Sequence, residues 1–435
     1  MKLRPFLQKL ENDGQLVRIT REVSRDYELA NILNALGEKP TIFENVRGFE
    51  MPVFGGICAS RDVIGTGLNT TKEGILPVLV KALREPKVPE LVSKAPCQEI
   101  VDRSPDLDKL PLLMHLQGDG GRYLSASVCI IKDPDTGRNM SYHRMMQLGK
   151  NKLTARLIPK RQTRTTYDKI QRELEIAICI GSSVPVLAAA SLSPPSGVDE
   201  LAIANAIEET PLVKCVTKDL EVPADTEIVL EGRITRDVDR EGPFVDLTET
   251  RDPERKEPVV MIDAITMRKD AMYQALLPGR FEHKTLMGMP KEPTIFNEVS
   301  KVCECRNAYM TLGGGSWLHG IVQIAKKSDE DGKKAIDAAF RGHPSMKHVV
   351  IVDDVDPFDS GAVEWAIATR FRADKNLVIL NDQPSSSLDP VATEEPGKKA
   401  TVTKMGLDAT RPMTVGKNKF DKVKYGQVNV DEYLR

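Results

Sequence analysis

The beginning of the chain alternates between helical and strand patterns. Apolar residues recur three and four positions apart in three segments, which predicts helices over residues 4–14, 27–37 and 74–84. Gly37, followed by Pro40, should end the second helix. Short strands are predicted at TIFENV (41–46) and MPVFGGI (51–57). These patterns predict a compact α/β unit.

Prolines are scattered among charged residues over 85–120, which is typical of an extended connector. We expect this stretch to lie on the surface of the fold. Residues 1–120 would then form an N-terminal α/β unit with its connector.

Strand patterns dominate residues 121–290, where short runs of β-branched and apolar residues are separated by Gly, Asp and Pro. The expected strands cover residues 125–131, 139–148, 152–158, 175–180, 227–234 and 259–267. One helix is expected at 199–210. The uncharged residues 176–195 contain Gly181 and Pro185, so they fit a buried strand followed by a loop rather than a membrane span. This region is predicted to be a sheet or barrel with few helices.

Helical and strand patterns alternate again over residues 291–435. Helices are expected at 293–303, 328–341 and 359–370, and strands at 348–356 and 376–380. This alternation predicts a second α/β domain with parallel strands. The last 45 residues show little periodicity and are expected to be loop and tail.

Composition narrows the class of protein. Lys and Arg number 61 against 63 Asp and Glu, and this balance argues against a general nucleic-acid binder. Seven cysteines, mostly within apolar runs, are expected to be reduced thiols, as in cytoplasmic proteins. The first residues, MKLRPFLQKLENDG, are charged throughout and do not resemble a signal peptide, so a cytoplasmic, membrane-free location is expected.

Two acidic residues flank a Gly-Pro step in DREGPFVD (239–246). Gly-Pro fits neither a regular helix nor a central strand, so the segment should be a rigid turn. Such a turn can hold Glu241 and Asp246 at a fixed separation, as acid–base chemistry requires. A solvated acidic turn is the simpler interpretation of these residue types.

Polar and apolar residues also interleave in GRNMSYHRMM (137–146). Strand alternation would put Asn139, Ser141 and His143 on one face and Arg144 on the other. This row is either a ligand-binding wall or the wet face of an edge strand. In AAASLSPPSGVDE (188–200), small residues would allow close approach of a flat ligand or a phosphate. The isolated histidines, including His283 and His319, have no metal-binding spacing.

The order and spacing of these segments resemble the UbiD family of decarboxylases, which use prenylated FMN. The resemblance extends over nearly the whole chain. Its motifs are NMSYHR (139–144), AAASLSPPSGVDE (188–200), EGPFVD (241–246), VVIVDDVD (349–356), VEWAIATR (363–370), SSSLDP (385–390) and TKMGLDATRP (403–412). It implies an N-terminal α/β unit, a central split β-barrel related to flavin reductases that holds the cofactor, and a C-terminal α/β domain. It also implies a homodimer or a higher homo-oligomer.

The resemblance implies a divalent metal, typically Mn²⁺, that binds the cofactor phosphate through Asn139 and Glu200. Some members add a His near residues 160–162, but IPKRQ contains none, so Gln162 or water would take its place. A potassium ion near Ser191 and Glu200 is a further expectation. The implied cofactor-binding residues are Ser141, Tyr142, His143, Arg144, Arg156, Leu157, Ile158, Arg161, Gln162, Ala189, Ala190, Ser191, Leu192 and Lys347.

Arg144, Glu241 and Asp246 resemble the family's catalytic Arg–Glu–acid set. The implied reaction is decarboxylation of an α,β-unsaturated acid, with Asp246 returning a proton to the former α-carbon. Asp246 would then need a pKa raised by burial and by the charge of Glu241. Arg144 would orient the acids and the substrate carboxylate. A separate flavin prenyltransferase would supply the cofactor.

The compact chain resembles the archaeal branch of the family, which implies trans-anhydromevalonate 5-phosphate as substrate and isopentenyl phosphate and CO₂ as products of a modified mevalonate pathway. A basic cluster could supply charge for the phosphates, or could be an exposed strand and loop. Its members are Lys150, Lys152, Arg156, Lys160, Arg161 and Arg164. The alternatives are an aromatic acid decarboxylase of the 4-hydroxybenzoate type and a non-catalytic flavin-phosphate-binding protein.

Overall fold

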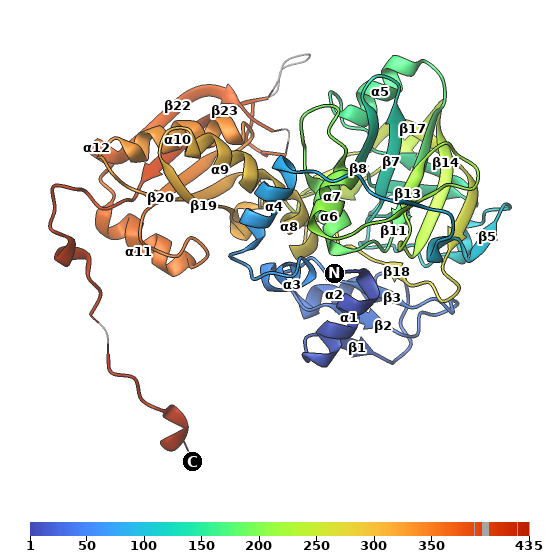
Figure 1. Ribbon diagram of the computed structural model, residues 1–435, viewed down its shortest axis with the longest axis horizontal. Coiled ribbons are helices and arrows are strands. Elements are labelled where there is room, and N and C mark those ends of the chain that lie inside the picture. Colours follow the sequence, from blue (N-terminus) through green and yellow to red (C-terminus); the bar gives the residue numbers. More distant parts are fainter. Residues whose placement is uncertain (387, 394–399, 424, 435) are drawn as a thin grey trace. The chain divides into compact units, whose positions relative to one another are not determined.

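The computed structural model describes residues 1–386, 388–393, 400–423 and 425–434 (Figure 1). The chain divides into two compact units. The first contains Met1–Pro293, Met310–Leu318 and Ser387–Pro390, and the second contains Thr294–Tyr309, His319–Ser386 and Val391–Arg435. Among the described residues, every helix is too short or too polar to cross a membrane.

The N-terminal part of the first unit builds a small sheet with the strand order β1-β2-β3-β18. Its strands are β1 (Val17–Ile19), β2 (Thr41–Phe43), β3 (Val53–Gly55) and β18 (Tyr273–Gln274). The helices of this part are α1 (Leu3–Asn12), α2 (Glu28–Leu36), α3 (Arg61–Gly67) and α4 (Ile75–Arg84). In α1 the buried side chains are Leu3, Phe6, Leu7 and Leu10, the helical spacing read from the sequence. The expected helices and strands are confirmed, and α3, which contains two glycines, is an addition.

A nine-stranded sheet forms the centre of the first unit. Its order is β6-β9-β10-β17-β14-β11-β7-β8, with β5 paired to β17. The strands are β5 (Ile100–Asp102), β6 (Tyr123–Leu124), β7 (Val128–Asp133), β8 (Gly137–Tyr142), β9 (Met145–Gly149), β10 (Lys152–Ala155), β11 (Leu174–Ile180), β14 (Ile228–Glu241) and β17 (Arg255–Met267). Side chains alternate between two apolar cores along β11, with Ile176 and Ile178 in one and Ala177 and Cys179 in the other. A sheet buried on both faces explains the unbroken apolar run in this strand.

Shorter elements connect these strands. The helices are α5 (Gln162–Ile170), α6 (Val184–Ser191), α7 (Glu200–Ile207) and α8 (Phe281–Gly288). The remaining strands of this unit are β4 (Leu91–Val92), β12 (Leu212–Lys214), β13 (Glu221–Pro223), β15 (Phe244–Val245) and β16 (Arg251–Asp252). β13, β12 and β4 form one small sheet, and β15 pairs with β16.

Three expectations for this unit were wrong. The 85–120 segment is not a surface connector, because β5 joins the large sheet and Leu107, Leu110 and Leu112 are buried. Residues 139–148 are two strands, β8 and β9, which pair with different neighbours. The expected loop before residue 195 contains α6, whose first turn holds Pro185, a position where a helix tolerates proline.

The second unit contains a five-stranded sheet with the order β19-β20-β21-β23-β22. Its strands are β19 (Glu304–Met310), β20 (His319–Ala325), β21 (His348–Val352), β22 (Leu377–Pro384) and β23 (Thr401–Asp408). Its helices are α9 (Glu292–Ser300), α10 (Asp331–Gly342), α11 (Ser360–Arg370) and α12 (Ala373–Asn376). β21 is parallel to both β20 and β23, whereas β22 is antiparallel to β23. The expected parallel strands are therefore confirmed in β20, β21 and β23, and β22 adds an antiparallel strand.

The expectation that the last 45 residues are only loop and tail was wrong, because β23 lies inside this sheet. Its sequence, TVTKMGLD, contains a lysine and a glycine that weaken the strand pattern. The lysine, Lys404, is buried and donates a hydrogen bond to the Pro344 carbonyl, so its charge is accommodated inside the unit.

We predict that Ile351→Ala lowers the free energy of unfolding of the second unit by about 2–5 kcal/mol, because the deletion leaves a cavity around a side chain with no exposure. Urea denaturation followed by Trp365 fluorescence measures the change. Ile379→Ala is the matched control, since Ile379 in the same sheet is 48% exposed. Equal losses for the two variants would contradict the prediction.

Candidate active site

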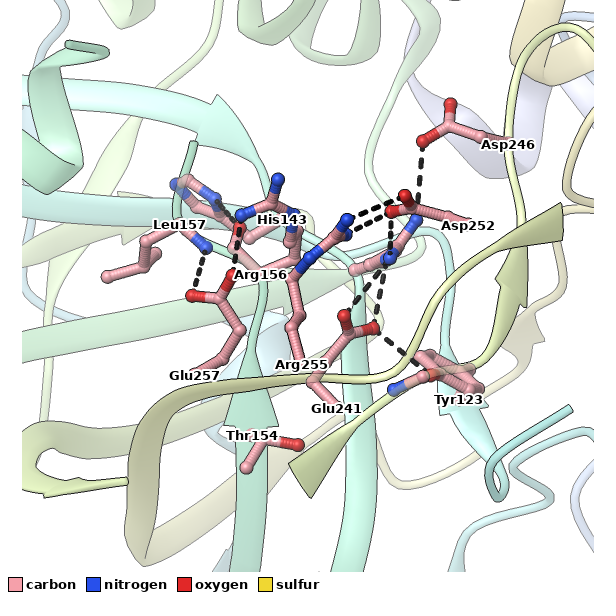
Figure 2. Close-up of polar contacts among 12 residues, drawn as sticks. Tyr123, His143, Thr154, Arg156, Leu157, Glu241, Asp246, Asp252, Arg255 and Glu257 are labelled. Atoms are coloured by element: carbon pink, nitrogen blue, oxygen red, sulfur yellow. Dashed lines mark hydrogen bonds and ion pairs between the residues drawn. The ribbon is translucent and has the colours of Figure 1, made fainter. Parts of the chain in front are cut away.

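The guanidinium of Arg144 is surrounded by three carboxylates. They belong to Glu241, Asp246 and Asp252, which Figure 2 labels. Its Nε and Nη2 donate to the two oxygens of Glu241 at 2.9 and 3.0 Å. Nη1 lies 3.3 Å from Asp246 Oδ2, and Nη2 lies 2.6 Å from Asp252 Oδ2. The Glu241 side chain is 0% exposed and that of Arg144 is 12% exposed. The structure thus brings together the three residues Arg144, Glu241 and Asp246 singled out in the sequence, and adds Asp252, which was missed.

Two interruptions of the large sheet place these groups. Arg144 lies in the break between β8 and β9, directly after His143, and it does not share the face that carries Asn139 and Ser141. Glu241 is the last residue of β14, and Gly242 follows with a φ of +92°, a conformation that favours glycine. The short β15–β16 pair then returns the chain, which brings Asp246 and Asp252 to the same guanidinium.

Tyr123 fixes the carboxylate of Glu241. Its hydroxyl donates to Glu241 Oε1 at 3.0 Å and accepts from the Gly242 backbone N–H at 2.9 Å. Burial, and then the charge of Glu241, raise the pKa of Tyr123, so the hydroxyl remains a donor. The Tyr123 ring also lies 3.9 Å, between centroids, from the Phe244 ring. No sequence pattern pointed to this tyrosine, because it lies far from residues 239–246 along the chain.

The charges of this cluster do not balance. Arg255 donates to both oxygens of Asp252, at 2.8 Å in the case of Nη2 and Oδ1. Although burial acts in the opposite direction, Arg255 and Arg144 lower the pKa of Asp252. Two arginines therefore face three carboxylates. Asp246 has the weakest contact, one 3.3 Å approach from Arg144 besides the Leu247 N–H, so the uncompensated negative charge belongs mainly to Asp246.

His283, on α8, adds an imidazole beside these acids. Its Nδ1 accepts from the Gly279 backbone N–H at 2.9 Å, so a neutral ring carries its proton on Nε2. Burial lowers the pKa of His283, and the nearby charge of Asp246 opposes that shift. His283 was only one of several isolated histidines in the sequence, and no local signal distinguished it.

A second polar cluster joins Asn139, Gln162 and Glu200. Asn139 Nδ2 lies 3.0 Å from Glu200 Oε1 and 3.3 Å from Gln162 Oε1, and the Met140 N–H donates to Glu200 Oε2 at 2.9 Å. Glu200 is 3% exposed, and burial raises its pKa to about 7. Within the described part of the chain, no Lys or Arg forms an ion pair with it. A buried carboxylate beside two side-chain amides, whose oxygens are available as ligands when the amides turn, fits a hard divalent cation.

A metal site in this second cluster would depend on the side-chain amides of Asn139 and Gln162. Among the residues described, no three His, Cys, Asp or Glu side chains gather as a metal site would require. Gln162 does lie beside Asn139, at the position where the family His is absent. The three predicted residues thus come together, and the site fits a cation only if Asn139 and Gln162 turn their carbonyl oxygens toward it.

His143 extends this cluster along β8. Its Nδ1 donates to the Arg156 carbonyl at 3.1 Å, which leaves Nε2 to accept from Thr163 Oγ1 at 3.0 Å. Burial lowers the pKa of His143 to about 4, so the ring is neutral. Ser141 Oγ lies 3.2 Å from His143 Nε2. Tyr142 instead packs against an apolar core of the first unit.

The other residues expected near the cofactor are spread over several elements. Arg156 forms an ion pair with Glu257, which also accepts from the Leu157 N–H (Figure 2). Ala189, Ala190 and Leu192 are buried, and Ser191 Oγ donates to the Ala188 carbonyl. Ile158 and Arg161 are exposed, and Lys347 lies in the second unit, directly before β21.

The basic cluster read from the sequence is largely neutralised. Lys150 pairs with Asp106, Lys152 with Asp239, Arg156 with Glu257 and Arg164 with Asp168. Within the described ranges, only Lys160 and Arg161 of the six form no ion pair. As a group, these residues do not offer free charge to two phosphates.

We predict that Tyr123→Phe lowers the free energy of unfolding by about 1–3 kcal/mol, because the buried Gly242 N–H and Glu241 each lose a hydrogen bond. Urea denaturation of the full chain measures this change. Tyr425→Phe is the control, since Tyr425 is 96% exposed. An unchanged midpoint for Tyr123→Phe would show that its hydroxyl does not hold the turn.

Comparison with known proteins covers both units. Three family models match: the N-terminal, Rift-related and C-terminal domains of 3-octaprenyl-4-hydroxybenzoate carboxy-lyase, at residues 7–83, 90–281 and 284–409. The anhydromevalonate phosphate decarboxylase of Methanothermobacter thermautotrophicus is 41% identical over 97% of this chain and 99% of its own. That of Methanosarcina mazei is 38% identical, with the same coverage.

Comparison with solved structures points to the same family. The UbiD-class enzyme HmfF from Pelotomaculum thermopropionicum, in complex with FMN, superimposes with a TM-score of 0.94 at 35% identity, covering 100% of both chains. The 3,4-dihydroxybenzoic acid decarboxylase of Enterobacter cloacae, 24% identical, has the same fold, with a TM-score of 0.91 over 99% of this chain and 98% of its own. The multi-domain α/β fold is therefore that of UbiD-class enzymes, and the chain belongs to the UbiD family of decarboxylases.

Proposed function

We propose that the protein decarboxylates trans-anhydromevalonate 5-phosphate to isopentenyl phosphate and CO₂, a non-oxidative step of a modified archaeal mevalonate pathway of isoprenoid synthesis. The observation that carries the proposal is the Arg144, Glu241 and Asp246 cluster in a chain 41% identical to an archaeal anhydromevalonate phosphate decarboxylase. The decarboxylase class follows from the family, and the substrate follows from these relatives.

The nine-stranded sheet is proposed as a split β-barrel of the flavin-reductase type that binds prenylated FMN. HmfF in complex with FMN, and a dimeric form of it in complex with prFMN, support a flavin in this domain. Asn139, Gln162 and Glu200 would hold Mn²⁺ or another divalent cation against the cofactor phosphate. Their support is the buried carboxylate of Glu200, which lies beside amides rather than a basic residue. We also propose a potassium ion near Ser191.

The residues of the acid cluster would have different roles in the proton transfer. When bound, prenylated FMN supplies the electron sink for the loss of CO₂. Asp246 would hold a proton on its carboxyl group and deliver it to the former α-carbon. This proton takes the place of the departing CO₂. Asp246 is the carboxylate of the three with the weakest hold on the guanidinium, a single 3.3 Å approach from Arg144 Nη1. Arg144 would orient Asp246 and the substrate carboxylate, while Glu241, held by Tyr123, keeps the guanidinium in place.

Assembly and location complete the proposal. An evolved dimeric form of HmfF, 34% identical to this chain, supports a homodimer or higher homo-oligomer. In the tail, Val423, Tyr425 and Tyr433 are exposed apolar side chains that a second subunit could cover. Each of the seven cysteines, all within the described ranges, carries a free thiol, which supports a cytoplasmic protein. A flavin prenyltransferase would supply the cofactor.

The substrate is tested with protein co-expressed with a flavin prenyltransferase. The purified holoenzyme is incubated separately with trans-anhydromevalonate phosphate and 4-hydroxybenzoate, and CO₂ and product are quantified. We expect turnover of the phosphate ester only. Turnover of the aromatic acid alone would contradict the proposal and favour quinone synthesis. Turnover of neither acid, with the modified flavin bound, would reject both substrates and favour a non-catalytic flavin-binding protein.

We predict that Asp246→Asn lowers kcat at least about 100-fold, because the amide cannot donate a carboxyl proton. The variant should keep the flavin absorption spectrum, and incorporation of solvent deuterium at the product's former α-carbon should disappear with turnover. Asp239→Asn is the control, since Asp239 is a partly exposed acid that pairs with Lys152. Deuterium incorporation that survives in Asp246→Asn would reject Asp246 as the donor.

A further inference from the structure

Arg161 is an exposed cation beside the predicted metal site. It ends a turn in which its backbone N–H donates to the Ile158 carbonyl at 3.2 Å. Lys160 adopts a φ of +64° in this turn, a conformation that lysine rarely takes. Within the described part of the chain, Arg161 forms no ion pair, whereas neighbouring Arg156 and Arg164 do. Its charge is therefore available to a ligand.

Lys291 approaches the same place from another part of the first unit. It ends the helical turn Met289–Lys291, which directly follows α8. Its Nζ lies 3.3 Å from Ser193 Oγ and 5.4 Å from the centroid of the Trp317 ring. Burial, and next the charge of Arg161, lower the pKa of Lys291 to about 8. Two cations that repel one another, next to a hydroxyl donor, form an environment that an anion stabilises.

Arg161 and Lys291 lie on the chain segments that carry residues of the two polar clusters. Arg161 directly precedes Gln162, which contacts Asn139. Lys291 follows His283 by eight residues along α8 and its continuation, roughly 12 Å at the rise of a helix. The cations thus lie on the segments that carry the metal-site amide and the imidazole beside Asp246.

We propose that Arg161, Lys291 and Ser193 bind the phosphate group of the substrate. The inference rests on the proposed function and names the part of the molecule that recognises the non-reacting end of a phosphate monoester. Arg161 offers the planar fork of donors that suits a phosphate, Lys291 a compact charge, and Ser193 a hydroxyl. The remaining basic residues of the sequence cluster, apart from Lys160, already pair with carboxylates.

The flavin cofactor also carries a phosphate monoester, so the experiment separates the two sources. Isopentenyl phosphate is titrated into the FMN-loaded full chain by calorimetry, and FMN into the flavin-free full chain by fluorescence quenching. Both are repeated with Lys291→Gln, with the conservative Lys291→Arg and with Arg164→Gln, a nearby arginine paired to Asp168. Isopentenol, which lacks the phosphate, serves as the ligand control.

We expect Lys291→Gln to raise the Kd of isopentenyl phosphate at least about ten-fold and to leave that of FMN within two-fold. Lys291→Arg should restore most of the affinity, and Arg164→Gln should match the unmodified protein. Weaker FMN binding in Lys291→Gln would overturn the proposal by assigning the cations to the cofactor. So would an unchanged Kd, or no binding of isopentenyl phosphate by the unmodified chain.

A failure of this subsite and a failure of the proposed function give different results. Binding of isopentenyl phosphate that depends on Lys291, in an enzyme that does not decarboxylate the phosphate ester, would leave the subsite intact and reject the reaction. Normal turnover with an affinity that Lys291→Gln leaves unchanged would reject only the subsite.

Discussion

The burial of Glu241 is the constraint on which the rest of the acid cluster depends. Its side chain has no exposure, so its carboxylate needs donors that replace water. Arg144 supplies two and Tyr123 a third, and both reach it because regular structure is interrupted nearby. The break between β8 and β9 releases Arg144, and the turn at Gly242 brings a backbone N–H to the tyrosine hydroxyl. The strands of the large sheet thus fix the positions of Glu241 and Arg144, and both residues lie where a strand ends.

Both polar clusters of the first unit hold more negative charge than their own basic residues neutralise. Around Arg144 the excess rests mainly on Asp246, whose one contact with the guanidinium is 3.3 Å long. At Glu200 the raised pKa shows the cost of ionising a carboxylate among amides, which a divalent cation would remove. A fold selected for stability alone would pair such groups with arginines, as it does at Glu257. The imbalance is what a proton donor and a metal site both need.

The sequence was most informative where local pattern and local structure coincide. Helical spacing located α1, α2 and α4, and the family resemblance of the motifs identified Arg144, Glu241 and Asp246 as one set, which the structure brings together. Local pattern could not reveal β23, which gains its place in the sheet through backbone pairing although its buried positions carry Lys404, Gly406 and Asp408. Tyr123, Asp252 and His283 were missed for a related reason. Each acts through a contact between distant parts of the chain, and none has a distinctive neighbour in sequence.

The residues proposed for proton transfer and those proposed for phosphate recognition lie in different kinds of structure. In the acid cluster, Glu241 ends the long strand β14 and Arg144 lies between β8 and β9 of the same large sheet, so the geometry of this pair is tied to the core. Arg161 and Lys291 instead belong to turns, one after β10 and one after α8. Turns tolerate substitution better than strands, so the end of the site that meets the non-reacting part of a substrate can change while the reacting part stays fixed. HmfF, with a TM-score of 0.94 at 35% identity, is a case of one scaffold kept while most residues change.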